Sequence, residues 1–298
     1  MLDSIITKKN RDVSFAKARN DFPTKVSGSR SGYFDPPIPP KGVLELVQYP
    51  TVLGNMDAYI TPKPAKHGRY PAVIWLSDHF ENSIDSKLWD EKLSHVNGTV
   101  FRDAGFVVFY PSLRGGNKNP GSNENAYGEV NDVQAACIYL KNREEVDPNQ
   151  IFLVGHGTGG TLALLTAAYR SDGFRGVLAF GPVARMDYYH SSELNYNIMD
   201  RDETLLRSPL YWINDITCKT WVVEGRNSPL SNELSRIHEN NYLARHVSFN
   251  LIYNFDHDTI VEPTSKVYIQ KIKTLKESTD KITIDPNDDI KVMQQMRK

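Results

Sequence analysis

The chain has 298 residues, of which 40% are hydrophobic and 24% charged, a composition typical of a globular protein with a sizeable core. Its 35 basic and 36 acidic side chains nearly cancel, so the charge does not predict binding to nucleic acid or to an anionic membrane. No stretch resembles a signal peptide or reaches the ~20 apolar residues of a membrane span, so we expect a cytoplasmic protein. Cys137 and Cys218 predict two buried free thiols rather than a disulfide.

The chain begins with a polar segment that becomes rich in proline. Residues 35–40 read Asp-Pro-Pro-Ile-Pro-Pro, which favours extended backbone, so we expect residues 1–41 to form an extended arm on the surface. At the other end, residues 278–298 are polar and predict an appended surface tail. The folded domain is therefore expected to span residues 42–277.

Within this domain, short apolar runs alternate with stretches of helical spacing. The runs that predict strands are 42–49, 57–61, 72–76, 106–110, 151–154, 176–180, 220–223 and 247–253. The helical stretches are 129–140, 161–169, a helix beginning near 231, and 263–275. This alternation predicts an α/β fold with a mostly parallel central sheet and helices on both faces. The tyrosine-rich segment 185–212 predicts a small cap over a pocket.

The most informative segment joins the strand at 151–154 directly to the helix at 161–169. It contains the frame Gly155-His156-Gly157-Thr158-Gly159. A Gly-x-x-x-Gly frame lets a strand turn sharply into a helix and raises the central residue in strained geometry. In hydrolases that residue is a serine nucleophile, and the next N–H faces the oxyanion. A generic glycine-rich turn remains an alternative, whereas dinucleotide and Walker phosphate loops do not fit.

Three ordered motifs carry a resemblance to a known family. They begin at Tyr110 (YPSLRGGNKNPG), Tyr127 (YGEVNDV) and Val146 (VDPNQIFLVGH). The chain resembles bacterial α/β-hydrolases close to the prolyl-oligopeptidase and dienelactone-hydrolase families, from about Pro36 to Ile272. The resemblance implies an α/β-hydrolase fold and acyl-transfer chemistry on esters or peptides. Relatives read Gly-His-Ser-Thr-Gly-Gly at the turn, so Gly157 stands where they carry the nucleophile.

The loop after the strand at 72–76 also departs from these relatives, which place small residues there, usually a pair of glycines. A carboxylate at Asp78 would repel an oxyanion rather than stabilise it. The residues that we assign to the oxyanion hole and the pocket are Ser77, Asp78, His79, Thr158 and Arg114.

The remaining members of a catalytic triad are only partly matched. His257 lies in the loop that carries the family's histidine, and we assign it to the triad-histidine position. No Asp follows the strand at 220–223, so Asn227 is our candidate for the acid position, although Glu224 or Glu233 could substitute. Asn227 could orient a histidine but would not stabilise an imidazolium as a carboxylate does. The other histidines show no ligand spacing, so we predict no metal and no cofactor.

Three interpretations follow. The chain is a natural pseudoenzyme that binds a small molecule or a peptide, an inactivated member of a serine peptidase or esterase lineage, or an enzyme with a relocated nucleophile. For the last, the candidates are Ser77, Thr158 and Asp78. Each places its function in a pocket between the loops at 76–80, 114–128, 157–158 and 257.

Overall fold

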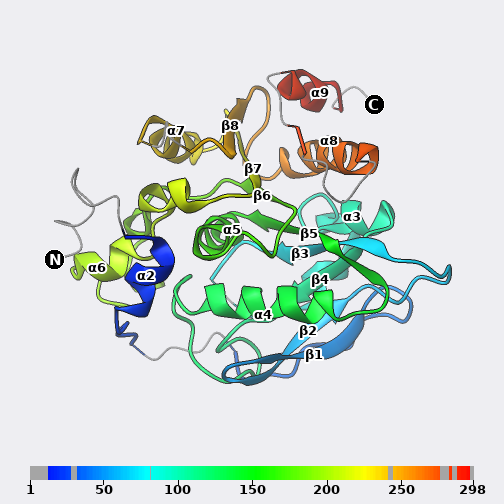
Figure 1. Cartoon of the computed structure of the whole chain (residues 1–298), viewed down its shortest axis with the longest axis horizontal. Helices are drawn as coiled ribbons and strands as arrows, with labels where there is room; N and C mark the ends of the chain where they lie inside the picture. Colours follow the sequence, from blue (N-terminus) through cyan, green and yellow to red (C-terminus); the bar gives the residue numbers. More distant parts are fainter. Residues whose placement is uncertain are drawn as a thin grey trace.

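The computed structural model describes residues 13–27, 32–80, 82–240, 244–275, 282–283 and 287–295. Within these residues one eight-stranded sheet has the order β1-β2-β4-β3-β5-β6-β7-β8 (Figure 1). β1, β2 and β4 pair antiparallel, and the strands from β4 through β8 pair parallel. The strands are β1 (Glu45–Thr51), β2 (Gly54–Ile60), β3 (Tyr70–Leu76), β4 (Val107–Pro111), β5 (Val146–His156), β6 (Gly176–Phe180), β7 (Lys219–Gly225) and β8 (Val247–Ile252). The predicted mostly parallel sheet is confirmed.

Helices cover both faces of this sheet. The α-helices are α2 (Phe15–Asn20), α3 (Thr99–Asp103), α4 (Glu129–Lys141), α5 (Thr158–Tyr169), α6 (Arg201–Leu205), α7 (Ser231–Asn240), α8 (Val261–Thr274) and α9 (Asp288–Gln295). Short 3-10 helices lie at η1 (Ser86–Trp89), η2 (Glu91–Leu93), η3 (Met186–Tyr188), η4 (Ser191–Glu193), η5 (Pro209–Tyr211) and η6 (Ile213–Asp215). All four predicted helical stretches are helices, and α5 begins directly after the turn at Gly157.

Two hydrophobic cores lie on opposite faces of the sheet because side chains alternate along each strand. In β3, Ala72, Ile74 and Leu76 pack into a core with α4, α5 and α7. Val73 and Trp75 point the other way, into a core with α3 and α8. The continuous apolar run of β3 is therefore the sequence of a strand buried on both faces.

The N-terminal segment differs from the predicted extended arm. Residues 15–20 form helix α2, and Phe15 at its start is fully buried against Trp212, with 5.0 Å between the ring centroids. Ser14 caps this helix, since its side chain accepts a hydrogen bond from the N–H of Lys17. The proline-rich run at 35–40 therefore does not predict the backbone of residues 15–20, which are helical. Residues 1–12 and 28–31 lie outside the described part of the chain.

The predicted cap segment lies between β6 and β7 and holds η3, η4, α6 and η5. The N-terminal segment is attached to it. Lys25 donates its backbone N–H to Glu203, and Val26 forms an isolated bridge with Tyr196. Glu203 in turn forms a buried ion pair with Arg207. The arm and the cap therefore stabilise one another.

The described part of the C-terminal tail packs on the domain more closely than we predicted. Ile282 is 1% exposed, and Asp288 at the start of α9 accepts an ion pair from Lys271 of α8 at 2.8 Å. Residues 278–281, 284–286 and 296–298 of the predicted tail lie outside the described residues.

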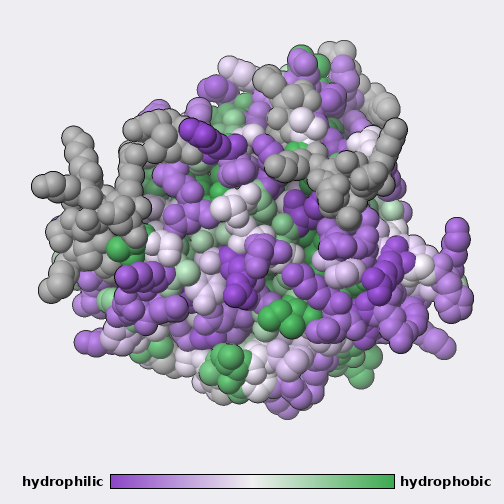
Figure 2. All heavy atoms as spheres, viewed as in Figure 1, coloured by the Kyte–Doolittle hydropathy of each residue, from purple (hydrophilic) through white to green (hydrophobic). Residues whose placement is uncertain are grey.

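The face of the domain in Figure 2 is largely polar, and the two cysteines differ in burial. Figure 2 shows hydrophilic side chains over most of the face in view, with apolar side chains in small separate groups. No helix in the described part of the chain has the length and apolar character needed to cross a bilayer. Both cysteines are free; Cys137 is buried, whereas Cys218 is only partly buried, contrary to the prediction of two buried thiols.

Candidate functional site

The turn between β5 and α5 is built from glycine at each crowded position. Gly157 has φ 55° and ψ −117°, a conformation that strains any residue with a side chain. A Cβ atom at Gly155 would collide with the carbonyl of Gly159, and one at Gly159 would collide with the carbonyl of Leu76. The Gly-x-x-x-Gly frame is therefore required by close contact between strand, helix and the end of β3.

The Asp78 carboxylate occupies the space beside Gly157. A Cβ atom built on Gly157 would lie 2.6 Å from Oδ2 of Asp78 and closer still to its Cγ and Oδ1. Oδ1 accepts hydrogen bonds from the backbone N–H of Thr158, at 2.8 Å, and from that of His79, at 2.7 Å. Thus a carboxylate from the loop after β3 fills the apex of the turn and takes up both nearby N–H donors.

His257 lies between two carboxylates. Its Nδ1 is 2.8 Å from Oε2 of Glu224, which is fully buried at the end of β7, and its Nε2 is 3.7 Å from Oδ2 of Asp78. Glu224 also accepts the N–H of Gly225 through Oε1, at 2.6 Å. Gly181 makes room for this pair, because a Cβ atom there would overlap both Glu224 and His257. The sequence reasoning did not identify Gly181.

The two carboxylates hold the imidazole in its charged form. Burial alone lowers the pKa of His257, but the contacts with Asp78 and Glu224 outweigh it and raise that pKa to about 10. Burial alone raises the pKa of the Asp78 carboxyl, but His257, His156 and the two backbone N–H donors lower it well below its usual range. At neutral pH the ionised Asp78 carboxylate therefore faces an imidazolium at His257.

This protonation state gives a testable expectation for pH titration. We expect long-range ¹H–¹⁵N spectra to show His257 protonated at pH 8 and losing its proton near pH 10, and Asp78→Asn to lower that pKa. Because the folded pKa lies above the ordinary 6.5, the stability contributed by His257 is fully present below about pH 6.5 and is lost as the pH rises through about 10. Asp85→Asn, on the same pocket wall, serves as the control. A neutral His257 at pH 8 would contradict the assignment.

His156 packs directly against His257. It is 4% exposed, its ring stacks on that of His257 with 4.3 Å between centroids, and its Nε2 lies 3.2 Å from the His257 carbonyl oxygen. Burial and the neighbouring His257 lower the pKa of His156 to about 4. His156 is therefore a packed, hydrogen-bonded core residue.

Ligand atoms of Asp78, His156 and His257 lie within 4.8 Å of one another, so these residues are the described group nearest to a metal-binding arrangement. The two imidazole rings, however, stack with an angle of 27° between their planes. Stacked rings direct their in-plane lone pairs side by side rather than toward one point, which does not suit a shared tetrahedral ion. The donor set of Asp78, His156 and His257 therefore fits a metal poorly. The sequence spacing alone did not indicate that these three residues lie together.

A cavity of about 600 Å³ opens above this site. Residues 76–80, Ala126, Thr158 and His257 line it. Much of the rest of the wall comes from residues 82–97, which the sequence reasoning had not assigned. The apolar side chains of this stretch make one side of the cavity hydrophobic, together with Leu113 and Leu162. Those of the stretch are Ile84, Leu88, Leu93 and Val96.

Other predicted site residues have different surroundings. Ser77 is exposed on the pocket wall, and His79 contributes its N–H while its side chain is 72% exposed. Asn227 donates its backbone N–H to the carbonyl of Phe255, and Glu224 holds the place beside His257 for which Asn227 was the candidate. Glu233, the other alternative acid, accepts the N–H of Ala184 instead.

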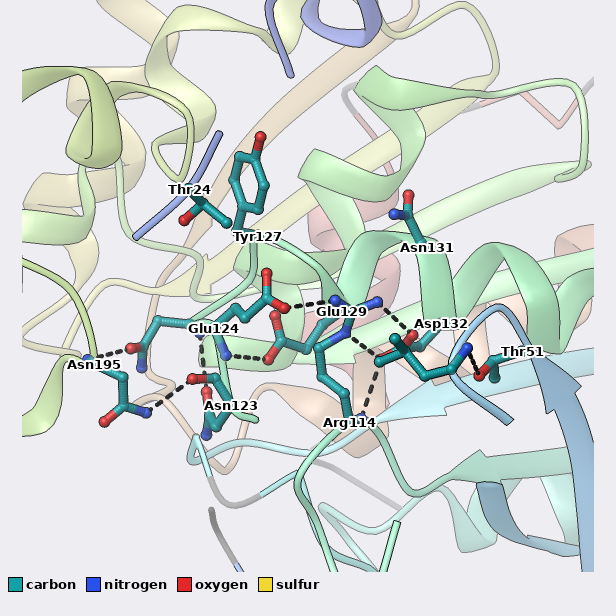
Figure 3. Close-up of polar contacts among 12 residues, drawn as sticks. Thr24, Thr51, Arg114, Asn123, Glu124, Tyr127, Glu129, Asn131, Asp132 and Asn195 are labelled. Carbon is teal, nitrogen blue, oxygen red and sulfur yellow. Dashed lines mark hydrogen bonds and ion pairs between the residues drawn. The ribbon is translucent and has the colours of Figure 1, made fainter. Parts of the chain in front are cut away.

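Arg114 does not line the pocket. Its side chain is 7% exposed and forms a two-pronged ion pair with Asp132 of α4, with Nη2 to Oδ1 at 2.8 Å and Nε to Oδ2 at 2.9 Å. A third bond joins Nη1 to Glu124 (Figure 3). The guanidinium is held by the buried Asp132 and the partly buried Glu124, so Arg114 has a structural role.

The cap meets the pocket only at its edge. Tyr189 packs against Phe80 with 4.8 Å between ring centroids, and Phe80 lines the cavity. The tyrosines of the predicted cap, Tyr188, Tyr189, Tyr196 and Tyr211, are not among the residues that line the pocket. The loop at 77–97 contributes that wall instead.

Comparisons with known proteins agree with this architecture. A sequence model of the prolyl oligopeptidase family matches residues 92–214. Among proteins of curated function, none matches the sequence. An esterase from Pyrobaculum calidifontis has a similar structure, with 17% identity, coverage of 78% of this chain and 84% of that chain, and a TM-score of 0.58.

Two peptidases are similar over a longer part of this chain. A puromycin-hydrolyzing peptidase of Mycobacterium tuberculosis gives 14% identity, 83% and 42% coverage, and a TM-score of 0.63. The acylaminoacyl peptidase of Pyrococcus horikoshii has 12% sequence identity and a TM-score of 0.61, and the match covers 83% of this chain and 44% of that chain. This chain spans less than half the length of either peptidase. At these identities the likeness establishes the fold, and the predicted α/β-hydrolase fold is confirmed.

Proposed function

We propose that this chain, which has the α/β-hydrolase fold, descends from the prolyl-oligopeptidase group, has lost serine-type hydrolysis of esters and peptides, and keeps a pocket for a small molecule or a peptide end. The family match over residues 92–214 and the turn that differs from the relatives at Gly157 alone support the descent. The observation that carries the loss of acyl transfer is the position of the Asp78 carboxylate against Gly157.

The Asp78 carboxylate opposes acyl transfer in two ways. It occupies the space in which a nucleophilic side chain at 157 would lie, and its Oδ1 holds the two N–H donors that an oxyanion would need. A negative charge at this point would also repel the negative charge that develops on an acyl substrate. Removing the nucleophile of a triad alone leaves only ~10³–10⁴-fold acceleration over water, from the oxyanion hole and substrate binding. Here the oxyanion hole is filled as well.

The resting charge of His257 supports the same proposal. A general base must be neutral to accept a proton, and the flanking carboxylates raise the pKa of His257 to about 10. Among the described contacts, none joins the hydroxyl of Ser77 or of Thr158 to this imidazole. A relocated hydroxyl nucleophile therefore has less support than the loss of acyl transfer.

Activity-based labelling tests this proposal directly. We expect a fluorophosphonate probe to leave the protein unlabelled and p-nitrophenyl acetate to be hydrolysed no faster than by the heat-unfolded chain. An active serine esterase treated in parallel shows that the probe is competent. Labelling of Ser77 or Thr158, identified by peptide mass spectrometry and abolished by Ser77→Ala or Thr158→Val, would overturn the proposal.

A further inference from the structure

We propose that Asp78 is a carboxylate nucleophile that opens epoxides, and that His257 with Glu224 then activates the water that hydrolyses the resulting ester. This activity goes beyond the proposed function, which concerns only acyl transfer by a hydroxyl group. It rests on the geometry of one partly buried carboxylate, its two backbone donors and the imidazole beside it.

The two oxygens of Asp78 have different surroundings. Oδ1 accepts two backbone N–H bonds, from Thr158 and His79. Among the described residues, Oδ2 has longer ion-pair contacts, to His257 Nε2 at 3.7 Å and to His79 Nδ1 at 3.9 Å. The side chain is 25% exposed and lines the cavity, so a substrate can reach it. A carboxylate anchored through one oxygen and accessible through the other is arranged for nucleophilic attack.

The site is built around this carboxylate. A buried carboxylate is costly unless it is paired and hydrogen-bonded, and Asp78 has both kinds of partner. Its position requires that residue 157 carry no side chain, and the Glu224–His257 pair beside it requires the same of Gly181. Random loss of a serine at residue 157 would not explain why Asp78, Gly157 and Gly181 fit together so closely.

In the first step, Oδ2 of Asp78 attacks a ring carbon of the epoxide. The new bond joins Oδ2 to this carbon, the bond from the carbon to the ring oxygen breaks, and the ring oxygen leaves with the electron pair. That alkoxide takes the imidazolium proton of His257, relayed by water. The products of this step are a hydroxyalkyl ester of Asp78 and a neutral imidazole.

In the second step, a water molecule attacks Cγ of the ester and gives its proton to neutral His257. The negative charge then develops on Oδ1, where the N–H groups of Thr158 and His79 already lie. Collapse breaks the bond between Cγ and the alkyl oxygen, which leaves as a diol after taking the proton back from His257. The new Asp78 carboxylic acid returns a proton to the imidazole, which restores the starting state.

The resting charge of the site favours an epoxide over an alkyl halide. An epoxide oxygen leaves as an alkoxide and needs a proton, which the imidazolium between Asp78 and Glu224 holds ready. A halide needs none, so His257 would first have to lose its proton to solvent before it could activate water. The apolar wall that includes Ile84, Leu88 and Val96 suits a neutral alkyl or aryl substituent.

Isotope labelling tests the proposal with 1,2-epoxyhexane and styrene oxide as probes and the full-length protein in molar excess in ¹⁸O-labelled water. We expect a diol that carries no ¹⁸O in the first turnover, and one ¹⁸O atom in the Asp78 peptide. Asp78→Asn and Asp78→Ala should each lower diol formation at least about 10³-fold while circular dichroism shows a folded protein. The control Asp172→Asn, at an exposed ion pair with Arg170 outside this cavity, should keep the rate.

Each other outcome counts against the inference. Diol that contains ¹⁸O while Asp78 stays unlabelled would mean direct attack by water. Turnover of 1-bromohexane but of neither epoxide would overturn the choice of substrate, and no turnover of either epoxide would overturn the activity. These results leave the fluorophosphonate and ester assays unaffected, so failure of this inference is distinct from failure of the proposed function.

Discussion

Gly157→Ser alone will not produce an esterase, whereas Gly157→Ser combined with Asp78→Gly will. In the single variant the new side chain meets the Asp78 carboxylate, and the N–H of Thr158 remains occupied. Removing Asp78 clears that space, frees the two N–H donors, and leaves the contact between His257 and the Glu224 carboxylate in place. We expect kcat/KM for p-nitrophenyl acetate to be about 10²–10³-fold higher in the double variant than in either single variant, because an oxyanion hole contributes that much.

Asp78→Gly alone is the control, since it opens the site without supplying a nucleophile. Fluorophosphonate labelling of the double variant should fall on residue 157. A single Gly157→Ser variant as active as the double variant would show that the site differs from a serine hydrolase at one residue only. The proposed loss of acyl transfer through a rebuilt site would then fail.

Asp132→Ala will strongly destabilise the protein without acting on the pocket. Asp132 has a fully buried side chain and binds the Arg114 guanidinium through both oxygens, and it also accepts the backbone N–H of Arg114 at 3.0 Å. Without it the arginine keeps a buried charge with one fewer partner. Breaking such a pair costs about 3–5 kcal/mol, which we expect as the loss in free energy of unfolding measured by urea denaturation.

A surface pair provides the matched control. Arg170 and Asp172 also form an arginine–aspartate pair, at 3.6 Å, but their side chains are 62% and 79% exposed. Asp172→Ala should therefore change the free energy of unfolding by less than about 1 kcal/mol. Equal effects of the two substitutions would contradict the structural role assigned to Arg114.

The sequence predicted the architecture well because the sheet depends on local patterns. The strand at 176–180 was predicted with the observed bounds, and the run 72–76 lies within β3. Both are continuous apolar runs, which is how strands buried on both faces read. The turn at Gly157 was predicted equally well, since crowding between β5 and α5 restricts the residues on either side.

The chemistry of the site was harder to predict because it depends on contacts between distant segments. The sequence predicts that Asp78 repels an oxyanion. It does not show that the Asp78 side chain itself accepts a hydrogen bond from the N–H of Thr158, eighty residues further along the chain. The sequence leaves the acid open among Asn227, Glu224 and Glu233, because the apolar run ends at residue 223. β7 continues to Gly225, however, so Glu224 is still in the strand and reaches His257.

Arg114 shows a third limit of sequence reasoning. A motif beside a predicted pocket indicated a pocket residue, yet the carboxylates that bind it lie ten and eighteen residues further along the chain. Likewise, the polar N-terminal segment gave no sign that Phe15 would be buried against Trp212, nearly two hundred residues away. Such pairings are fixed by packing between elements, and single-sequence patterns do not encode them.

The overlap between Asp78 and any side chain at residue 157 also constrains how this lineage evolved. On the proposed descent, a serine at the turn is incompatible with Asp78 in its present position, so the serine was lost before Asp78 took that position, or together with it. Afterwards a single mutation back to serine meets an occupied space and brings no benefit on which selection could act. On that descent, the return of serine-type chemistry requires substitutions at both positions, Asp78 and Gly157.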